Sequence, residues 1–433
     1  AEINMLFKNI TILDENMEIK TGMYVAVDKD KIKYIGKNKP EGQFGREYDG
    51  RGKLLMPGFY NSHAHSPMSL MRGYGENLAL QDWLNKKIFP FEDKLNGNAI
   101  YWGTMLSYAE SLKFGIVSSS EMYYFMSDMA RAVSDSGIKA NLSRAVVNFD
   151  DSDVWQLPSV REMKSAFEQY HNACDGRIKM DVSIHAEYTS NHLAVSALSE
   201  YAKETGARVH VHVSETKLEH EECKQRHDGK TPVKYFNDLG LFDSPTTAAH
   251  CVWIEGEDFD ILREKGVTVA SNPASNLKLA SGVCNIPKLL NNNINVAIGT
   301  DSTASNNSLN FIEEMKLFAI APKAHFLDPK VISPTDTLKA ATINGALGQG
   351  RTDCGLIKEG YKADIIVLDI SGTHMHPVHD LKNNLVYSAS GSDVVLTMVD
   401  GKVLYDNGQY TTIDIEKTIY EAEQATKYIL SQL

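Results

Sequence analysis

The chain has 433 residues, of which 42% are hydrophobic and 23% are charged, a composition typical of a soluble globular protein with more than one domain. Its net charge of -12 argues against a nucleic acid or an anionic membrane as partner, because both require clustered Lys and Arg. No apolar run approaches the roughly 18 residues of a membrane span, and no signal-peptide pattern is visible. The five cysteines are scattered and form no C-x-x-C pair, so we expect a reducing, cytoplasmic location.

Both ends of the chain predict short β-strands. Residues 23–36 indicate a hairpin around Asp28 to Asp30, residues 364–368 a strand, and residues 394–405 a second hairpin with an Asp-Gly turn. Because these ends flank a different middle, the simplest arrangement is one small β domain built from both termini. Apolar residues at helical spacing, among them Ile415, Ile419, Ala422 and Ile429, predict a final surface helix.

The middle of the chain alternates eight strand-like runs with helical stretches, which predicts a (β/α)8 barrel. Active sites of such barrels lie at the carboxyl ends of the strands, so polar residues at those ends should meet around one mouth. These residues are His63 and His65, Glu121, Arg144, His185, His212, His250, Asn272 and Asp301. The expected division is 1–56 for the first part of the β domain, 57–351 for the barrel, and 352–433 for the second part with the final helix.

Four of the strand-end residues form a candidate metal site. His63 and His65 are two apart on a predicted strand, so both rings project to the same face. With His212 and Asp301 they offer nitrogen and carboxylate ligands, which suit Zn²⁺ and also Fe²⁺ or Mn²⁺. A bound divalent ion lowers the pKa of water to about 7, so hydroxide becomes available at neutral pH.

Other histidine pairs compete with this interpretation. His210 is also two residues from His212, so either could be the ligand; we favour His212 because Glu215 follows it. His374 and His376 lie in the terminal β domain, away from the mouth, and are interpreted as a solvated loop. A single H-x-H motif is weak evidence for a metal site. The prediction rests on the series of polar residues at successive strand ends.

Three side chains at the mouth suit proton transfer. Glu215 could carry protons between water and a leaving group, and His250 could hydrogen-bond the hydroxide or polarise the electrophile. Asp301 could be ligand and proton acceptor together. These residues predict hydrolytic attack on a polarised C=N or C=O carbon.

At these positions the chain resembles the amidohydrolase superfamily and, within it, the 5'-methylthioadenosine/S-adenosylhomocysteine deaminases. The resemblance covers essentially the whole chain. It rests on residues 57–65 (PGFYNSHAH), 66–73 (SPMSLMRG), 82–84 (DWL), 90–92 (PFE), 212–215 (HVSE), 249–251 (AHC), 271–279 (SNPASNLKL), 299–302 (GTDS) and 304–307 (ASNN).

The resemblance implies an amidohydrolase-type barrel with a small β-sandwich domain, and one divalent metal ion, with Zn²⁺ the first expectation. It also implies a role for each site residue. The metal ligands are His63, His65, His212 and Asp301; Glu215 is the proton shuttle at the ring nitrogen; His250 lies beside the hydroxide; Glu92 binds the ribose hydroxyls; His185 contacts the nucleoside; and Arg144 grips the homocysteine carboxylate.

Two departures from the family pattern concern that carboxylate. A second Arg would fall within residues 150–157, where none is found and Gln156 is the nearest residue. Glu187 follows the strand that ends at His185, and its charge would repel an anionic tail if it faced the pocket. Both disfavour S-adenosylhomocysteine and leave adenosine, 5'-methylthioadenosine and 5'-deoxyadenosine open.

The predicted function is hydrolytic deamination of an adenine nucleoside to the inosine analogue and ammonia, by a protein that could form a homo-oligomer. One alternative keeps the fold and changes the substrate: a deaminase or chlorohydrolase acting on guanine, a pterin or a triazine. Another is a non-catalytic metabolite-binding barrel with a structural metal. We favour an enzyme because Glu215 and His250 have no structural need to accompany the ligands.

Overall fold

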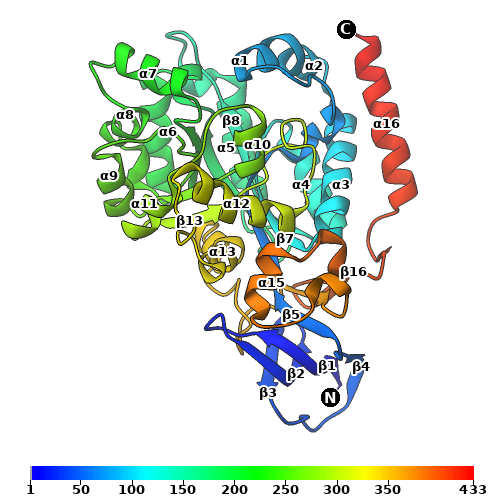
Figure 1. Ribbon diagram of the computed structural model, residues 1–433. Coiled ribbons are helices and arrows are strands. Elements are labelled where there is room, and N and C mark those ends of the chain that lie inside the picture. The colour runs from blue at the N-terminus through cyan, green and yellow to red at the C-terminus, as the bar shows by residue number, and fades with distance from the viewer. Residues whose placement is uncertain (1) are drawn as a thin grey trace.

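The computed structural model describes residues 2–433 and contains a parallel sheet and a mixed sheet. The parallel sheet has eight strands that follow one another in chain order and form the barrel in the upper part of Figure 1. They are β6 (Phe59–Ala64), β7 (Ile116–Tyr123), β8 (Lys139–Val146), β9 (Ile178–Ile184), β10 (Val209–Val213), β11 (Thr246–His250), β12 (Thr268–Ser271) and β13 (Asn295–Ile298). The predicted order of eight strands is confirmed.

The two end strands of this sheet, β6 and β13, are tied together at their carboxyl ends. The backbone N–H of Asp301 donates to the carbonyl oxygen of His63 at 2.9 Å. The side chain of Asn61 accepts from the N–H of Thr300 at 3.0 Å and donates to its hydroxyl oxygen at 2.7 Å. The seam that closes the barrel therefore runs through two predicted metal ligands.

Helices follow the barrel strands and cover the outer face of the sheet, as Figure 1 shows. Their packed side chains are part of one large apolar core that they share with the strands. They are α3 (Gly97–Lys113), α4 (Met126–Ser136), α5 (Pro158–Tyr170), α6 (His192–Thr205), α7 (Lys217–Arg226), α8 (Pro232–Asp238), α9 (Asp258–Glu264), α10 (Pro273–Lys278), α11 (Ile286–Asn291), α12 (Phe311–His325), α13 (Pro334–Ala341) and α14 (Ile343–Gly348).

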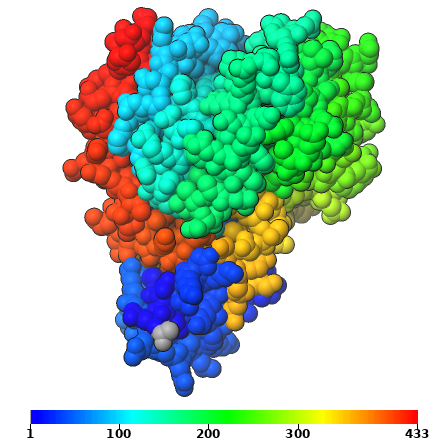
Figure 2. Space-filling model, turned by 180° about the vertical axis from the view of Figure 1, so that it is seen from behind, coloured from blue at the N-terminus to red at the C-terminus, as the bar shows by residue number. Residues whose placement is uncertain are grey.

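The mixed sheet combines strands from both ends of the chain, as predicted, and its N-terminal strands form the narrow lobe at the bottom of Figure 2. Hydrogen bonds connect all its strands into one sheet, and bulges in β1 bend it around a second apolar core. Both predicted hairpins are present, as β2–β3 and β15–β16. The strands are β1 (Ile3–Leu13), β2 (Ile19–Asp28), β3 (Lys31–Gly36), β4 (Phe44–Asp49), β5 (Lys53–Pro57), β14 (Ile365–Asp369), β15 (Val394–Val399), β16 (Lys402–Asp406) and β17 (Gln409–Tyr410).

A buried ionic network joins the two sheets at the amino end of the barrel. Lys139, the first residue of β8, lies 2.5 Å from Asp364 and 2.6 Å from Asp400. Asp364 precedes β14, and Asp400 is in the turn between β15 and β16. The hydroxyl of Tyr60 in β6 also donates to Asp364, at 2.6 Å. The network couples the β domain to the barrel on the side away from the predicted site.

The last elements are α15 (Leu381–Tyr387) and α16 (Ile415–Ser431), which lies beside α3 in Figure 1. The predicted surface helix is therefore present, with Ala422 and Ile429 buried as expected. Ile419 is 46% exposed, because Thr418 occupies the buried position on that turn. None of the described helices combines the length and the apolarity that a membrane crossing needs.

Candidate active site

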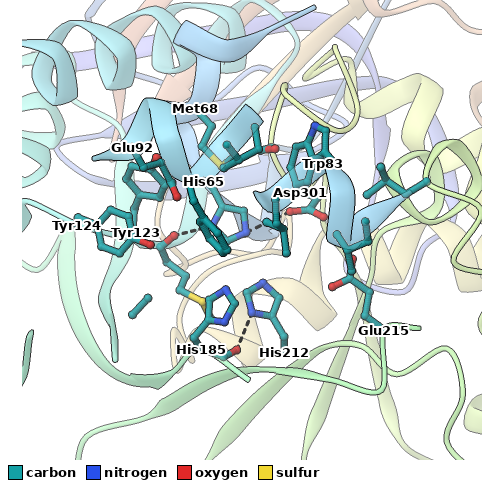
Figure 3. A pocket seen from close by; sticks show the side chains of 18 of the residues that line it. His65, Met68, Trp83, Glu92, Tyr123, Tyr124, His185, His212, Glu215 and Asp301 are labelled. Atoms are coloured by element: carbon teal, nitrogen blue, oxygen red, sulfur yellow. Dashed lines mark hydrogen bonds and ion pairs between the residues drawn. The ribbon is translucent and has the colours of Figure 1, made fainter. Parts of the chain in front are cut away.

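The predicted metal ligands converge at the carboxyl ends of the barrel strands (Figure 3). Ring nitrogens of His63, His65 and His212 lie within 4.8 Å of one another, and ring nitrogens of His63 and His250 lie equally close to each other and to a carboxylate oxygen of Asp301. Oδ1 of Asp301 is 3.2 Å from Nε2 of His65 and 3.5 Å from Nε2 of His63. The fold thus gathers four strand ends, separated widely in sequence, around one centre.

Hydrogen bonds on the far side of the rings fix their orientation. Nδ1 of His65 lies 2.5 Å from the carbonyl oxygen of Met122, and Nδ1 of His212 lies 2.6 Å from that of His185. Nδ1 of His63 is 2.9 Å from Nε2 of His210. Such outer contacts leave Nε2 free to bind a metal, as is usual for metal-binding histidines. The structure thereby separates the competing pair: His212 joins the cluster and His210 supports His63.

The charge states of His63, His212 and Asp301 also suit a cation. Burial lowers the pKa of His63 to about 3 and that of His212 well below the ordinary value, so both rings are neutral. Burial alone would raise the pKa of Asp301, but the adjacent rings of His63 and His65 outweigh it and hold the pKa well below its usual range.

Two buried atoms at the centre have no hydrogen-bond partner among the described residues: Nε2 of His63 and Nε2 of His250. Unpaired buried nitrogens are costly unless something else satisfies them. Neutral imidazoles beside an ionised carboxylate are the donor set that Zn²⁺ and similar ions prefer. The residues present therefore fit a divalent metal ion, as the sequence predicted.

Glu215 and His250 lie beside this cluster. Nε2 of His250 is 3.5 Å from Oε1 of Glu215 and 3.7 Å from Oδ2 of Asp301. Its Nδ1 is 2.8 Å from Oδ1 of Asn276, which fixes the ring. Burial, reinforced by the charge of Asp301, raises the pKa of Glu215 to about 8. Glu215 therefore holds a proton at neutral pH and can donate it.

Three residues of this region have a left-handed backbone conformation although none is glycine. The φ angles are 49° for Ser214, 79° for His250 and 57° for Asp301. Each conformation costs about 1–3 kcal/mol, and such residues cluster at functional sites. The strain occurs where the chain leaves β10, β11 and β13, at the end of the barrel where His250 and Asp301 meet the cluster.

A cavity opens onto the cluster and is the pocket of Figure 3. One wall is formed by three short consecutive helices: α1 (Leu80–Trp83), the π-helical turn η2 (Leu84–Ile88) and α2 (Phe89–Glu92). Its lining includes the predicted substrate contacts Glu92, His185 and Glu215. Burial raises the pKa of Glu92 to about 7, although the hydroxyl of Tyr123 donates to its carboxyl group.

The lining also contains aromatic residues to which the sequence assigned no role, namely Trp83, Tyr123, Tyr124 and Tyr188. Tyr123 is the last residue of β7, so the strand-end argument could have found it. Trp83 lies within one of the motifs of the resemblance, and Tyr188 follows the strand-end His185 by three residues. These rings offer flat apolar surfaces beside the cluster.

Arg144 and Gln156, the residues considered for an anionic tail, are outside the pocket lining. Nε of Arg144 lies 2.5 Å from Oε1 of Glu162, and the guanidinium group stacks over the ring of Tyr124 at 4.7 Å from its centre. Gln156 accepts a hydrogen bond from the side chain of Arg161. Glu162 thus gives Arg144 a carboxylate partner within the protein, and the contact of Arg144 with an anionic tail stays a prediction.

Glu187 does not face the pocket. Its buried carboxylate lies 2.5 Å from the guanidinium group of Arg226 and 2.8 Å from Nε2 of His227. Glu187 would repel an anionic tail only if it faced the pocket, and it does not. Its ion pairs instead anchor the segment after β9 to the end of α7.

The fold and the site together define a metal-dependent hydrolase built on a (β/α)8 barrel. Residues 54–404 match the Amidohydrolase family, and the chain belongs to that family. The chain is 40% identical over 433 residues to a 5-methylthioadenosine/S-adenosylhomocysteine deaminase of Thermoanaerobacter pseudethanolicus, covering 99% of this chain and 100% of the relative. It is 37% identical over 433 residues to a 5'-deoxyadenosine deaminase of Methanosarcina mazei, covering 99% of each chain.

A solved structure supports the same fold. An adenosine deaminase from Xanthomonas campestris with bound zinc superposes with a TM-score of 0.94 and 27% identity, covering 100% of this chain and 99% of the other. The fold class predicted from the sequence, a barrel with a small β domain formed by both chain ends, is thereby confirmed.

Proposed function

We propose that the protein is a zinc-dependent deaminase of adenine nucleosides whose 5' substituent carries no charge. The observation that carries this proposal is the arrangement of a buried carboxyl group, Glu215, beside the histidine cluster and Asp301 at one end of an aromatic pocket. The full-length likeness to proteins named as deaminases of adenine nucleosides supports the same reaction.

His63, His65, His212 and Asp301 would hold the metal ion. When bound, the ion supplies a Lewis acid that makes hydroxide available from water near neutral pH. The protein's own residues supply the proton transfers. Glu215 protonates N1 of the purine as C6 is attacked, since its raised pKa keeps a proton on it.

Asp301 is ionised and receives the proton that the attacking water releases. His250, held by Asn276, hydrogen-bonds the attacking oxygen through its otherwise unpaired Nε2. Asp301 passes this proton to the 6-amino group, which leaves C6 as ammonia, and the proton that remains on the attacking oxygen returns to Glu215, so the product is the inosine analogue. In this scheme Glu215 donates a proton and Asp301 accepts one. Their different environments move the two carboxyl pKa values in opposite directions, which is why one carboxyl group is the acid and the other is the base.

The other pocket residues hold the nucleoside so that its C6 and N1 atoms meet Glu215, His250 and Asp301. Glu92 accepts hydrogen bonds from the ribose hydroxyls, and His185 contacts the nucleoside. Trp83 and Tyr188 offer rings against which a purine can pack. Fixing C6 at attack distance contributes through orientation, which can supply several kcal/mol of the barrier reduction.

The proposed exclusion of charged 5' groups rests on what lines the cavity. No lysine or arginine is among the pocket-lining residues of the described chain. Arg144 is the arginine closest to the predicted role, and Glu162 already neutralises it. A carboxylate brought into the pocket would lose its hydration without gaining a cationic partner, which is unfavourable.

The test is to incubate zinc-loaded protein with adenosine, 5'-methylthioadenosine, 5'-deoxyadenosine, S-adenosylhomocysteine and guanine, and to measure ammonia release. We expect turnover of at least one uncharged nucleoside, with kcat/KM for S-adenosylhomocysteine lower by about tenfold or more, because one unpaired charge costs at least about 1.4 kcal/mol. Absence of turnover with every adenine nucleoside would contradict the deaminase. Efficient turnover of S-adenosylhomocysteine would contradict only the exclusion of charge, and preference for guanine would support another heterocycle.

A further inference from the structure

Helix α7 begins immediately behind the candidate proton donor and departs from the usual way of starting a helix. Its N-cap, Thr216, accepts the backbone N–H of Glu219 at 3.1 Å. In the common capping box, a glutamate at this position also accepts the N–H of the cap residue itself. Here Oε2 of Glu219 instead accepts the N–H of Glu215, at 3.1 Å. The first turn of α7 thus holds the backbone of a pocket residue.

This arrangement is more than a helix cap requires. Asp336 completes a capping box with Ser333 at the start of α13, and it does so in a solvent-accessible position. Glu219 is buried, at 5% exposure, and is outside the pocket lining. Burying a carboxyl group is costly, so an exposed glutamate would serve a simple cap better. The buried position matters only because it brings the carboxyl group to Glu215.

The next residue of α7 makes a parallel contact. Nδ1 of His220 is 2.9 Å from the hydroxyl oxygen of Ser214, and its Nε2 is 3.0 Å from Oε1 of Glu255. Ser214 has the left-handed φ of 49°. Two consecutive helix residues therefore hold two consecutive residues of a strained bend, and the second of these carries the proton donor.

We propose that Glu219 is a positioning residue: by accepting the backbone N–H of Glu215 it fixes the direction in which the Glu215 carboxyl group points. The inference rests on the proposed deaminase function, in which that carboxyl group must meet N1 of the purine. A displacement of about 1 Å at a reacting group can cost about 100-fold in rate. Glu219 does not line the pocket, and its hydrogen bond to the site is the one that it accepts from the backbone of Glu215.

The experiment compares Glu219→Ala, Glu219→Gln and the matched control Asp336→Ala. In Glu219→Ala we expect kcat to fall by at least about tenfold with KM within about threefold, because the donor is misaligned while nucleoside binding remains. Glu219→Gln keeps an oxygen that can accept the N–H and should retain kcat within about threefold. Asp336→Ala removes a capping carboxyl group far from the pocket and should lower Tm without changing kcat.

A crystal structure of Glu219→Ala, compared with wild type in the same crystal form, gives a readout that does not depend on activity. We expect the Glu215 carboxyl group to be displaced or to occupy several orientations. An unmoved Glu215 with wild-type kcat would overturn the inference, and so would equal losses in the Ala and Gln variants. A wild-type protein inactive on all adenine nucleosides would refute the proposed function instead, and the crystal comparison would then decide the positioning on its own.

Discussion

At the scale of single residues, His63 and Glu215 have different roles that substitution can separate. His63→Ala removes a fully buried nitrogen donor from the cluster, so bound zinc should fall well below one ion per chain. Glu215→Gln keeps the shape of the side chain and should keep the zinc, but kcat should fall by about 100-fold or more because proton donation is lost. Elemental analysis and ammonia release measure the two effects.

A circular dichroism spectrum of each variant, compared with that of wild type, shows whether the variant is folded. This distinguishes a folded protein that has lost zinc from an unfolded one. If Glu215→Gln deaminates at nearly the wild-type rate, Glu215 is not the proton donor. If His63→Ala binds zinc at wild-type stoichiometry, His63 is not a ligand, and His210 becomes the nitrogen to test next.

A second residue, Glu314 of α12, should make stability depend on pH. Its buried carboxyl group accepts the N–H of Ala274 at 2.9 Å and the side-chain amide of Asn306 at 2.5 Å. Burial raises its pKa to about 8, against 4.5 for an ordinary glutamate. The folded state alone therefore binds this proton between those pH values, so the stabilisation is complete below pH 4.5 and is lost as pH rises to 8.

Glu314→Gln removes this titration, so its Tm should fall less steeply than that of wild type between pH 5 and pH 8. Thermal denaturation at several pH values measures the slope. Glu264→Gln, at an exposed position of α9, should keep the wild-type slope. Parallel curves for wild type and Glu314→Gln would show that the carboxyl group titrates normally.

At the scale of elements, the end of β13 must come very close to that of β6. Gly299 follows β13, and a methyl group built on it would lie 2.4 Å from Oδ1 of Asn272 and 2.8 Å from Cβ of His63. Gly299→Ala should therefore displace His63 and reduce zinc affinity by about tenfold or more, since ligand geometry is fixed by such supports. Zinc titration against a competing chelator measures the change.

Gly176→Ala provides the control for this prediction. Gly176 has a φ of +85° and open space around it, so the substitution strains the backbone without touching the site. It should lower Tm and leave zinc affinity unchanged. Equal zinc affinities in the Gly299 variant and wild type would mean that the seam tolerates extra volume.

The sequence predicts elements best where a local pattern determines them. The barrel strands are apolar runs that end in polar residues, and the β15–β16 hairpin has an Asp-Gly turn, so both are visible without a structure. The pocket wall of residues 80–92 cannot be predicted in the same way. It contains a π-helical turn, whose apolar residues do not follow the spacing of an α-helix or a strand. Its motifs were recognised, but its place over the pocket depends on packing against distant strands.

Contacts between side chains are the part that the sequence could not supply. Arg144 was predicted to bind a carboxylate, and the structure pairs it with Glu162, a charge on the following helix α5 that no spacing rule identifies. Glu187 was considered as a pocket charge, and its pairing with Arg226 and His227 is set by how α7 packs. The roles of the substrate-contacting residues, the two domain boundaries, the homo-oligomer and the cytoplasmic location stay predictions.

At the scale of the whole molecule, the network around Lys139 connects the barrel to the β domain. Lys139→Ala would leave the buried carboxylate of Asp364 and the partly buried carboxylate of Asp400 close together without their cation. Breaking a buried ion pair in this way typically costs about 3–5 kcal/mol, and we expect the free energy of unfolding to fall by about that amount. Zinc content should not change, because the network is at the opposite end of the strands.

Urea denaturation followed by tryptophan fluorescence and circular dichroism measures this loss. Lys179→Ala is the matched control, because Lys179 lies near the same end of β9 and bonds an exposed Asn172 side chain at 2.6 Å. The control should change stability by less than about 1 kcal/mol. A Lys139 variant as stable as the control would show that the network is not needed to hold the two parts together.

The seam between β6 and β13 has a consequence for how the protein is made. His63, His65 and His212 are synthesised long before Asp301, and the backbone bond between His63 and Asp301 forms only when the last strand is laid beside the first. A growing chain that has not reached residue 301 has three of the four donors and an open sheet. The ion therefore binds with its full affinity only when β13 has joined β6 and the barrel is complete. During refolding, metal binding thus reports the closure of the barrel.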